Sequence, residues 1–526
     1  MNSRNPGLRA VRKPCRMLMP ALLVALALGG CTALPSIDGR QPSAALSPEQ
    51  AQATTLGRAI APRMAAHPGV SGVHPLSDPR VAFAARMQLA RAAERTLDVQ
   101  YYIWQDDITG TMLLGELERA ALRGVRVRLL LDDNGIRGMD DTLAALDALP
   151  NFQVRLFNPF AYRTFKWANY VTDFSRLNHR MHNKSFTADN QVTIIGGRNI
   201  GDIYFAAAAD IQFADLDVLA VGPVVPKVSS EFDRYWASTL AYPVDRLVRA
   251  PTEGTLARFD ARDARLARDP AASAYRQALV EDRAVQRLFD KAESLTWAPT
   301  QMLSDSPAKA LGQNAAGDGV REALLRIFAG STVSLDLVSP YLVPSVAGTR
   351  ALQAMARRGV QVRILTNSLG ANDAAVVHSG YRKRRKQLLQ AGITLYELPR
   401  TATVTGKPER VGAFSSSGSS LHAKTFAVDS QRLFIGSFNF DPRSANLNTE
   451  MGFVIESPAL AQALHTVFER EIPRRAYQVR LDADGKLYWL RWQDGTFRRY
   501  DTEPDTGWLR RLGVRVLSWL PIDWLL

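Results

Sequence analysis

The chain has 526 residues, and its formal net charge at pH 7 is +14. Hydrophobic residues make up 46% of it and charged residues 22%, which is an ordinary composition for a folded protein. The length excludes a single compact core, so we expect two or more domains. The positive charge favours an anionic partner such as nucleic acid, anionic lipid or a phosphorylated substrate.

The N-terminal residues 1–30 have the pattern of a lipoprotein-type signal peptide. Five basic residues precede the apolar stretch 21–28, which is too short to span a bilayer. The Leu-Gly-Gly-Cys sequence that ends at Cys31 resembles the bacterial lipobox, in which the cysteine becomes lipid-modified. An uncleaved anchor, or an ordinary signal with a chance cysteine, is the alternative. Without the five basic residues the net charge is about +9, so the basic character persists.

Residues 31–79, which are rich in Ala, Pro, Ser and Gly, are predicted to form a tether that leads into a first domain, 80–245. That domain begins with the strand-like run 95–107, continues with a helical pattern over 110–124 and returns to a buried strand over 125–133. Strand, helix and strand in this order predict a parallel α/β sheet.

The same order returns in a second domain, 321–475. A strand-like run over 331–343 precedes a helical pattern over 348–359 and a strand over 360–368. The helix ends also match, because ALRGVRVRLLLDD in the first domain parallels MARRGVQVRILTN in the second. We interpret this as an internal duplication rather than a short-period repeat. The charged, Ala-rich residues 246–320 are predicted to connect the two domains through helices and loops.

The last residues, 476–526, differ in character from the duplicated core. Short strand patterns separated by Asp-Gly turns, over 477–500, predict a small β-rich C-terminal extension. The final stretch, 508–526, mixes Trp and Leu with Arg and resembles an interfacial amphipathic segment. A terminal helix docked on the core is the equal alternative.

Two short segments with the same spacing, HxKxxxxD, carry the candidate chemistry. Their residues are His182, Lys184 and Asp189 in the first half, and His422, Lys424 and Asp429 in the second. In an extended strand, residues i and i+2 point to the same face, so each His and Lys meet one surface. One such segment is commonly a chance surface feature. Its recurrence with the same downstream pattern is not explained by chance.

A glycine-containing turn and then an acid follow each segment. The turn residues are Gly197 and Asn199 in the first half and Ser437 and Asn439 in the second, and the acids are Asp215 and Glu450. Gly allows close backbone approach, and Ser and Asn can donate to phosphate oxygens. A carboxylate beside an imidazole orients it and stabilises its cation. Because Gly197 stands where the second half has Ser437, we expect the halves to contribute unequally to phosphate binding.

The duplicated HxKxxxxD motif with its glycine turn resembles the signature of the phospholipase D superfamily. NHRMHNK, IIGGRNIGDIYF, DLDVLAVGPVV and LPID extend the resemblance over most of the chain after about residue 80, and they are most similar to the bacterial cardiolipin synthase C type. The resemblance implies an α/β fold. Two similar mixed or parallel β-sheet domains with flanking helices would form a pseudo-dimer, in addition to the C-terminal extension.

The resemblance also implies a two-step reaction without metal or other cofactor. One imidazole attacks phosphorus to form a phospho-histidine, and the other protonates the leaving alcohol. By analogy with the commoner assignment in the family, His182 is the expected nucleophile and His422 the acid/base, with Asp215 and Glu450 orienting the rings. Both lysines, Asn199 and Asn439 would flank the phosphate. By resemblance, the motif residues Asp189 and Asp429 stabilise the fold more than they touch substrate.

We therefore predict phosphatidyl transfer that forms cardiolipin. The expected partners are phosphatidylglycerol, alone or with phosphatidylethanolamine, and a membrane surface. The first alternative is a phosphodiesterase that hydrolyses phospholipid or, less favoured, nucleic acid. The second is a non-catalytic lipid-binding envelope lipoprotein. The expected location is the bacterial cell envelope, lipid-anchored and facing the periplasm, with the choice between inner and outer membrane left open.

Overall fold

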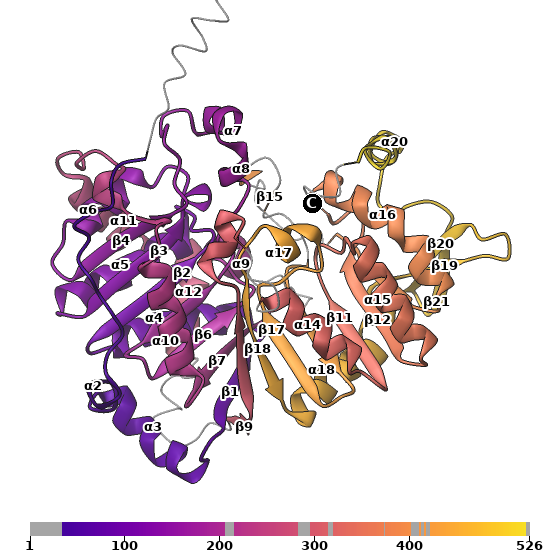
Figure 1. Cartoon of the computed structure of the whole chain (residues 1–526), viewed down its shortest axis with the longest axis horizontal. Coiled ribbons are helices and arrows are strands. Elements are labelled where there is room, and N and C mark those ends of the chain that lie inside the picture. The colour runs from indigo at the N-terminus through magenta and orange to yellow at the C-terminus, as the bar shows by residue number, and fades with distance from the viewer. Residues whose placement is uncertain are drawn as a thin grey trace, which may run out of the picture.

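The computed structural model of the chain describes residues 34–205, 215–281, 295–313, 319–372, 374–400, 410–411, 415–416 and 421–521. These residues form two large β-sheets, one from each half of the chain, with helices packed on their faces (Figure 1). Both sheets contain parallel and antiparallel pairs, which confirms the predicted fold class. The predicted signal peptide and Cys31 lie outside the described residues.

The first sheet has nine strands in the order β8-β4-β3-β2-β5-β6-β7-β1-β9. They are β1 Ser71–Leu76, β2 Thr96–Tyr101, β3 Arg126–Asp132, β4 Phe152–Phe157, β5 Ser185–Ala188, β6 Val192–Gly196, β7 Asp217–Val221, β8 Ala241–Pro243 and β9 Thr296–Ala298. β2, β3 and β4 pair in parallel. β2 is buried along its whole length and β3 along nearly all of it, as expected where helices cover both faces of a sheet.

The helices of the first half and the connection pack on the first sheet or on one another. The α-helices are α2 Pro48–Gln52, α3 Thr55–Ala66, α4 Pro79–Ala92, α5 Ile108–Leu122, α6 Asp140–Asp147, α7 Asn169–Thr172, α8 Phe174–Leu177, α9 Asp202–Phe205, α10 Val225–Trp236, α11 Thr255–Leu266 and α12 Ser273–Glu281. Short 3-10 turns are η1 Asp133–Gly135, η2 Lys166–Ala168, η3 Val244–Arg246 and η4 Pro270–Ala272.

The second sheet has ten strands in the order β10-β18-β17-β16-β11-β12-β13-β19-β20-β21. They are β10 Thr300–Ser304, β11 Ser334–Val338, β12 Gln361–Asn367, β13 Thr394–Leu398, β16 Thr425–Val428, β17 Arg432–Gly436, β18 Met451–Glu456, β19 Tyr477–Leu481, β20 Leu487–Gln493 and β21 Thr496–Tyr500. β14 Arg410–Val411 and β15 Ser415–Ser416 pair separately. The central order β13-β12-β11-β16-β17-β18 repeats the order β4-β3-β2-β5-β6-β7 of the first sheet, as a duplication requires.

The helices of the second half are η5 Pro307–Leu311, α14 Val320–Ala329, α15 Val346–Arg357, α16 Ala375–Gln390, α17 Pro442–Asn446, α18 Pro458–Arg470, α19 Ile472–Arg475 and α20 Trp508–Leu517. They pack on the second sheet or, in the case of α20, on the neighbouring helix α16. No helix among the described residues is long and apolar enough to cross a bilayer.

A buried ion pair repeats between the halves. Asp98 of β2 faces Arg128 of β3, with a Nε–Oδ1 distance of 2.7 Å. At the equivalent place Asp336 of β11 faces Arg363 of β12, at 2.6 Å. A buried charge is tolerated only when it is paired, so each half carries the same constraint on its strand register. Sequence reasoning did not identify these pairs.

The predicted tether is wrong in its last part, because β1 and α3 belong to the folded first half. β1 pairs with β7 and β9, and Leu56 and Ile60 of α3 are buried in the core. The chain before α2 is also fixed, since Arg40 donates to the carbonyl of Ser238 at 2.7 Å. The physical reason is that a few apolar side chains in an Ala- and Pro-rich segment suffice to add a strand between β7 and β9 and a helix that packs on the core.

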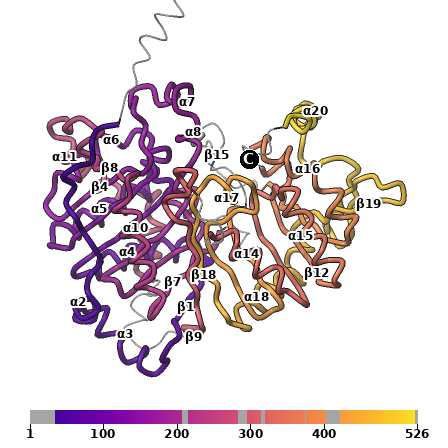
Figure 2. Tube along the Cα trace, viewed as in Figure 1, coloured from indigo at the N-terminus to yellow at the C-terminus, as the bar shows by residue number. Residues whose placement is uncertain are grey.

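The predicted C-terminal β extension is continuous with the second sheet. β19 pairs antiparallel with β13, and β20 and β21 follow as a meander at the sheet edge. Trp489 of β20 is buried and donates to Glu397 of β13 at 2.8 Å, which fixes the C-terminal strands to the rest of the second sheet. The chain trace shows these strands at the side of the molecule away from the first half (Figure 2).

The two halves share one apolar interface, which β6 and β7 form with β17 and β18. Buried side chains from both halves lie in a single cluster there, among them Ile195, Val218, Ala220, Ile435 and Phe453. Because this surface is fully buried and apolar, the halves behave as one body, and a site at their junction has a fixed geometry.

Candidate active site

Both His-Lys segments lie at the carboxyl edges of the parallel strands. β5, which begins directly after Lys184, starts at Ser185, paired with Gln100 near the end of β2. β16 starts at Thr425, paired with Val338 at the end of β11. The segments of the two halves therefore occupy equivalent places.

The backbone joins the first segment to the second half. The amide of His182 donates to the carbonyl of Thr449 at 2.9 Å, and the amide of Thr449 donates to the carbonyl of Arg180 at 2.9 Å. The hydroxyl of Thr449 donates to the side chain of Asn183 at 2.9 Å. The residue before Glu450 is thus bonded on both sides to the first motif, which brings that acid to His182.

Each histidine is held by the carboxylate of the opposite half. His182 Nδ1 lies 2.8 Å from Glu450 Oε2, and His422 Nδ1 lies 2.7 Å from Asp215 Oδ2. Since Nδ1 is bonded to a carboxylate in both rings, Nε2 is the nitrogen left for chemistry. Sequence reasoning identified both acids as orienting groups but not this crossed pairing, because no local pattern links residues more than 200 positions apart.

The two lysines are buried beside their own histidines. Lys184 Nζ donates to the carbonyl of His182 at 2.7 Å, and Lys424 Nζ donates to the carbonyl of His422. Burial lowers the pKa of Lys184 to about 7 and that of Lys424 to about 8. A bound phosphodiester would stabilise both ammonium groups, so the site is electrostatically prepared for an anion.

Burial and the lysine charges keep both imidazoles neutral in the free site. Burial, Lys184 and Lys424 together hold the pKa of His182 well below its usual range. Burial and Lys424 lower the pKa of His422 to about 4, although Asp215 opposes the shift. The charge of each lysine therefore acts on the histidine of the other half as well as on its own, as expected of one shared site.

The two orienting acids are electrostatically unequal. Burial raises the pKa of Glu450 to about 7, against the opposing charge of Lys184. Burial also acts to raise the pKa of Asp215, but its interaction and hydrogen bond with His422 and the charge of Arg198 outweigh burial and hold that pKa well below the usual range. Asp215 is thus ionised at neutral pH, whereas Glu450 is only partly ionised.

Asp189 and Asp429, the last residues of the two HxKxxxxD motifs, bind backbone amides. The carboxylate of Asp189 accepts from the amides of 94, 95 and 96, which lead into β2. That of Asp429 accepts from the amides of 332, 333 and 334, which lead into β11. These contacts fix the strand that carries each half of the site, in line with the expectation that both motif aspartates stabilise the fold more than they touch substrate.

The two asparagines that are predicted to bind phosphate are both buried. Asn199 is buried, and its Oδ1 accepts from the amide of Ile103, while its Nδ2 has no hydrogen-bond partner among the described residues. Asn439 is also buried; its backbone amide donates to Ser444 Oγ at 3.2 Å, and its side-chain Oδ1 has no hydrogen-bond partner among the described residues. Both side chains remain candidates for substrate contact.

Gly197 and Ser437, predicted to bind substrate, lie beside the orienting acids. A Cβ at Gly197 would lie only 2.1 Å from Asp215 Oδ1, so glycine leaves the room that this carboxylate needs. The hydroxyl of Ser437 donates to Glu450 Oε2. The two halves therefore support their carboxylates differently, and their unequal contribution to phosphate binding stays a prediction.

Two tyrosines complete the site and were missed by sequence reasoning. Tyr102 packs edge-on against His182 with ring centroids 5.1 Å apart, and Tyr204 packs in the same way against His422 at 5.3 Å. Both come from the first half. A Tyr directly after β2 is the only signal the sequence offered for Tyr102.

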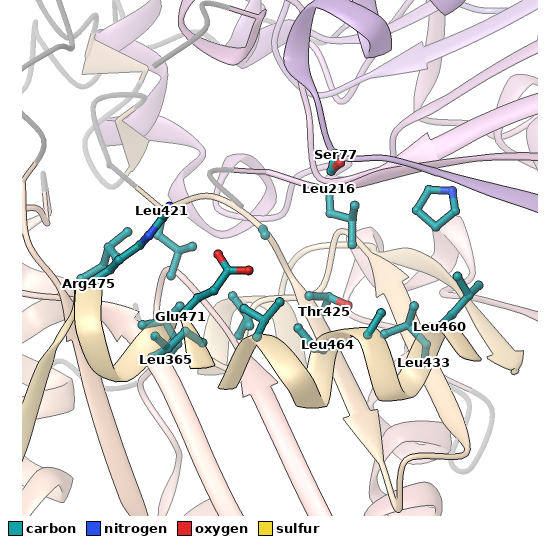
Figure 3. A pocket seen from close by; sticks show the side chains of 17 residues that line it. Ser77, Leu216, Leu365, Leu421, Thr425, Leu433, Leu460, Leu464, Glu471 and Arg475 are labelled. Atoms are coloured by element: carbon teal, nitrogen blue, oxygen red, sulfur yellow. The ribbon is translucent and has the colours of Figure 1, made fainter. Parts of the chain in front are cut away.

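An apolar cavity of about 200 Å³ lies behind the second motif (Figure 3). Leu421, Ala423 and Thr425 line it, and they alternate in sequence with His422 and Lys424. Leu216 closes it from the first half, and α18 supplies Leu460 and Leu464. The cavity therefore lies on the side away from the reactive groups and is distinct from the polar site.

Comparison with known proteins gives consistent matches over both halves. Residues 87–236 and 324–472 match the family model described as cardiolipin synthase, PLD-like domain. The chain is 47% identical over 471 residues to Cardiolipin synthase C of Escherichia coli, across 90% of this chain and 99% of that protein. It is 24% identical over 420 residues to Cardiolipin synthase of Staphylococcus aureus, across 80% and 71%. The crystal structure of phosphatidylserine synthase from Haemophilus influenzae superposes with a TM-score of 0.56 over 90% of this chain and 100% of that one. At 14% identity this is a likeness of fold.

Proposed function

This chain belongs to the cardiolipin synthase, phospholipase D-like family, and from that premise we propose that it is a phosphatidyltransferase that forms cardiolipin from phospholipids. The observation that supports this most directly is the pair of crossed His-carboxylate contacts between the halves. Two imidazoles whose Nδ1 atoms are held by carboxylates can serve as nucleophile and acid at one phosphorus atom.

In the first step, Nε2 of His182 attacks the phosphorus of a donor phospholipid. The bond between phosphorus and the headgroup oxygen breaks, and His422 transfers its Nε2 proton to the departing alcohol. The phosphatidyl group is then bound covalently to His182. Lys184, Lys424 and the free amide donor of Asn199 stabilise the added charge on the phosphoryl oxygens.

In the second step, His422 accepts the proton of a hydroxyl on the glycerol headgroup of phosphatidylglycerol. The resulting oxygen nucleophile attacks phosphorus, and the bond to His182 breaks. With phosphatidylglycerol as donor the products are cardiolipin and glycerol; with phosphatidylethanolamine they are cardiolipin and ethanolamine. Water in place of the lipid alcohol gives phosphatidic acid.

The unequal acids support His182 as the nucleophile and His422 as the acid/base. Attack requires a neutral imidazole, and the pKa of His182 is held well below the usual range. An imidazole that acts as an acid must first be protonated. The ionised carboxylate of Asp215 beside His422 stabilises that imidazolium. The negative charge of a bound phosphodiester raises the pKa of both rings and so favours protonation of His422 when substrate is present.

The finer setting of the reaction also belongs to this proposal. Lipid attachment at Cys31 would hold the protein in the bacterial cell envelope, facing the periplasm, where phosphatidylglycerol and phosphatidylethanolamine are the substrates. Either the inner or the outer membrane is compatible with this anchor. Palmitate labelling of the wild type and of Cys31→Ser tests the anchor directly.

The reaction is tested by incubating purified protein with isotope-labelled phosphatidylglycerol, with and without phosphatidylethanolamine, and identifying the products by mass spectrometry. We expect labelled cardiolipin, in equal amount with and without EDTA, and no product from His182→Ala. Phosphatidic acid as the only product would replace the transferase with a hydrolase. Full product formation by a His182→Ala, His422→Ala double variant would eliminate the proposed chemistry.

A further inference from the structure

One face of the C-terminal helix is apolar and exposed to solvent. Trp508, Leu509, Leu512, Val516 and Trp519, which we call the tail cluster, lie on α20 and the turn after it. Their spacing places them on one side of a helix. Trp508 is 65% exposed and Trp519 74% exposed, which is far more than a core-packed tryptophan shows.

The opposite side of α20 is fixed on α16. Val514 is buried, Arg382 of α16 donates to the hydroxyl of Ser518 at 3.2 Å, and Lys383 donates to the carbonyl of Leu520 at 2.9 Å. Below them, the buried Arg385 binds Glu397 of β13 and Glu503. The two predictions for this segment therefore apply to its two sides: it is a docked helix that presents an amphipathic outer face.

A second apolar cluster projects from the first half. Phe165, Trp167 and Val171, which we call the α7 cluster, lie on η2, α7 and the residue before them and are 63–80% exposed. The base of this segment is fixed, since Lys166 binds Asp133 at 2.9 Å and the hydroxyl of Tyr170 donates to Asn134 at 3.1 Å. Large exposed apolar side chains on a fixed base are typical of a surface that binds a membrane or a partner protein.

Both clusters lie at the edge of the molecule that carries the histidines. The α7 cluster follows the end of β4, and Asn134 below it contacts Tyr102, which packs on His182. On the other side, Arg510 of α20 donates to the carbonyl of Asn372, a few residues after the end of β12. α7 and α20 stand at the same side of the two sheets, one above each half (Figure 1).

The charge around the tail cluster identifies the partner chemistry. From Trp508 to Pro521 there are three arginines and no acid, and the adjoining α16 carries the run RKRRK. Tryptophan and leucine flanked by arginine suit the boundary between headgroups and acyl chains of an anionic bilayer, where the rings enter the interface and the cations meet phosphate.

We propose that the tail cluster and the α7 cluster form a two-point docking face for an anionic phospholipid bilayer, which turns the histidine-bearing edge toward the lipid surface. The proposal deepens the proposed function, because a phosphatidyltransferase must take both substrates from a bilayer, but membrane docking is measurable without catalysis. Two contacts on opposite halves define an orientation, which a single lipid anchor on a chain end does not.

Site-specific fluorescence tests the orientation in the full chain. Cys15→Ser and Cys31→Ser remove the native thiols, and Trp167→Cys or Leu512→Cys then carries a polarity-sensitive label. Matched controls are Leu122→Cys and Val333→Cys, which are exposed apolar positions at the amino edges of the sheets, 65% and 64% accessible. With phosphatidylglycerol vesicles we expect a blue shift and quenching by brominated acyl chains at 167 and 512, and neither at 122 and 333.

Two further measurements test the preference for anionic lipid and the connection between docking and catalysis. Apparent affinity should be at least about tenfold lower for phosphatidylcholine vesicles than for phosphatidylglycerol vesicles, because the arginines lose their counter-charge. Trp508→Ser, Leu512→Ser and Trp519→Ser together should reduce product formation on vesicles while leaving that on detergent-dispersed lipid unchanged. His182→Ala should lose both activities and keep the label response, so failure of the catalytic proposal is distinguishable. Equal responses at all four labels, or silence at 167 and 512, would overturn the docking face.

Discussion

The two halves of this protein have the same strand order and the same motif, yet their reactive groups are supported differently. The histidine of the first half relies on Glu450, whose pKa is raised by burial to about 7, and on the hydroxyl of Ser437. The histidine of the second half relies on Asp215, which is ionised and has room only because Gly197 lacks a side chain. The comparison teaches that a duplication can provide the geometry of a symmetric site while single substitutions assign the chemical roles.

The largest expected effect separates the two histidines. His182→Ala should lower turnover by at least about 10⁴-fold, because it removes the atom that forms the covalent bond. His422→Ala should cost about 10²–10⁴-fold with a natural lipid, but far less with a p-nitrophenyl phosphodiester, whose leaving group needs no acid. The measurement is a nitrophenolate burst together with trapping of the phosphorylated protein. If only the His182→Ala variant gives a burst, the two roles are exchanged.

The orienting acids should differ by a smaller factor. Asp215→Asn is expected to reduce kcat by about 10²–10³-fold, since it removes the charge that stabilises the His422 cation. Glu450→Gln should cost only about tenfold, because the raised pKa of Glu450 leaves this group partly neutral at pH 7 already.

The pH profile checks the same pair of variants. Raising the pH through 7 ionises Glu450 and makes the bonded His182 ring more nucleophilic, so the wild-type rate should rise across that range. Glu450→Gln should flatten this rise, whereas Asp215→Asn should keep it at a lower rate. Identical losses and identical profiles in both variants would mean that the two dyads are chemically equivalent.

The residues beneath the acids should have the next smaller effect. Gly197→Ser adds a Cβ that would lie only 2.1 Å from Asp215 Oδ1, so the carboxylate must move and kcat should fall by about 10–100-fold. Ser437→Gly removes one hydrogen bond to Glu450, worth about 1 kcal/mol, and should cost about fivefold. Unchanged thermal unfolding in both variants is the control that the loss arises in the site. A larger loss from Ser437→Gly would contradict the steric account.

The sequence alone predicted the two-sheet α/β class, the duplication and the two equivalent His-Lys segments, because spacing and hydrophobic periodicity are local properties. It did not predict that the acids cross between halves, since Asp215 and His422 meet only through the interface around Ile435 and Phe453. The same dependence on distant contacts explains why β1 was wrongly included in the predicted tether. Val73 and Leu76 make β1 a strand only because β7 and β9 lie beside it. Tyr204 lies within the quoted segment IIGGRNIGDIYF and Tyr102 directly follows a strand-like run, but neither position indicated that the ring would pack against a histidine.

The smallest expected effect on turnover concerns Asp189 and Asp429, which bind three backbone amides each. Asp189→Asn should destabilise the fold by about 3 kcal/mol and Asp429→Asn by about 1 kcal/mol, because buried amides that lose an acceptor cost more than half-exposed ones. The activity per folded molecule should stay near that of the wild type. Thermal unfolding with activity corrected for the folded fraction measures both quantities.

The pH dependence of that destabilisation distinguishes the two aspartates. Burial opposes ionisation of Asp429, but the amides of Ser334, Val333 and Thr332 outweigh it and lower the pKa. A lowered pKa in the folded state adds stability above the unfolded pKa of about 3.9 and loses it as the pH falls through the folded value. The deficit of Asp429→Asn should therefore grow from pH 3 to pH 6. Burial raises the pKa of Asp189 in the folded protein. The loss of unfolding free energy in Asp189→Asn should therefore not grow over that pH range, although the bonded amides are equivalent. If the loss of unfolding free energy grew equally with pH in both variants, the two aspartate–amide contacts would be energetically equivalent. The difference between the halves would then lie in the site alone.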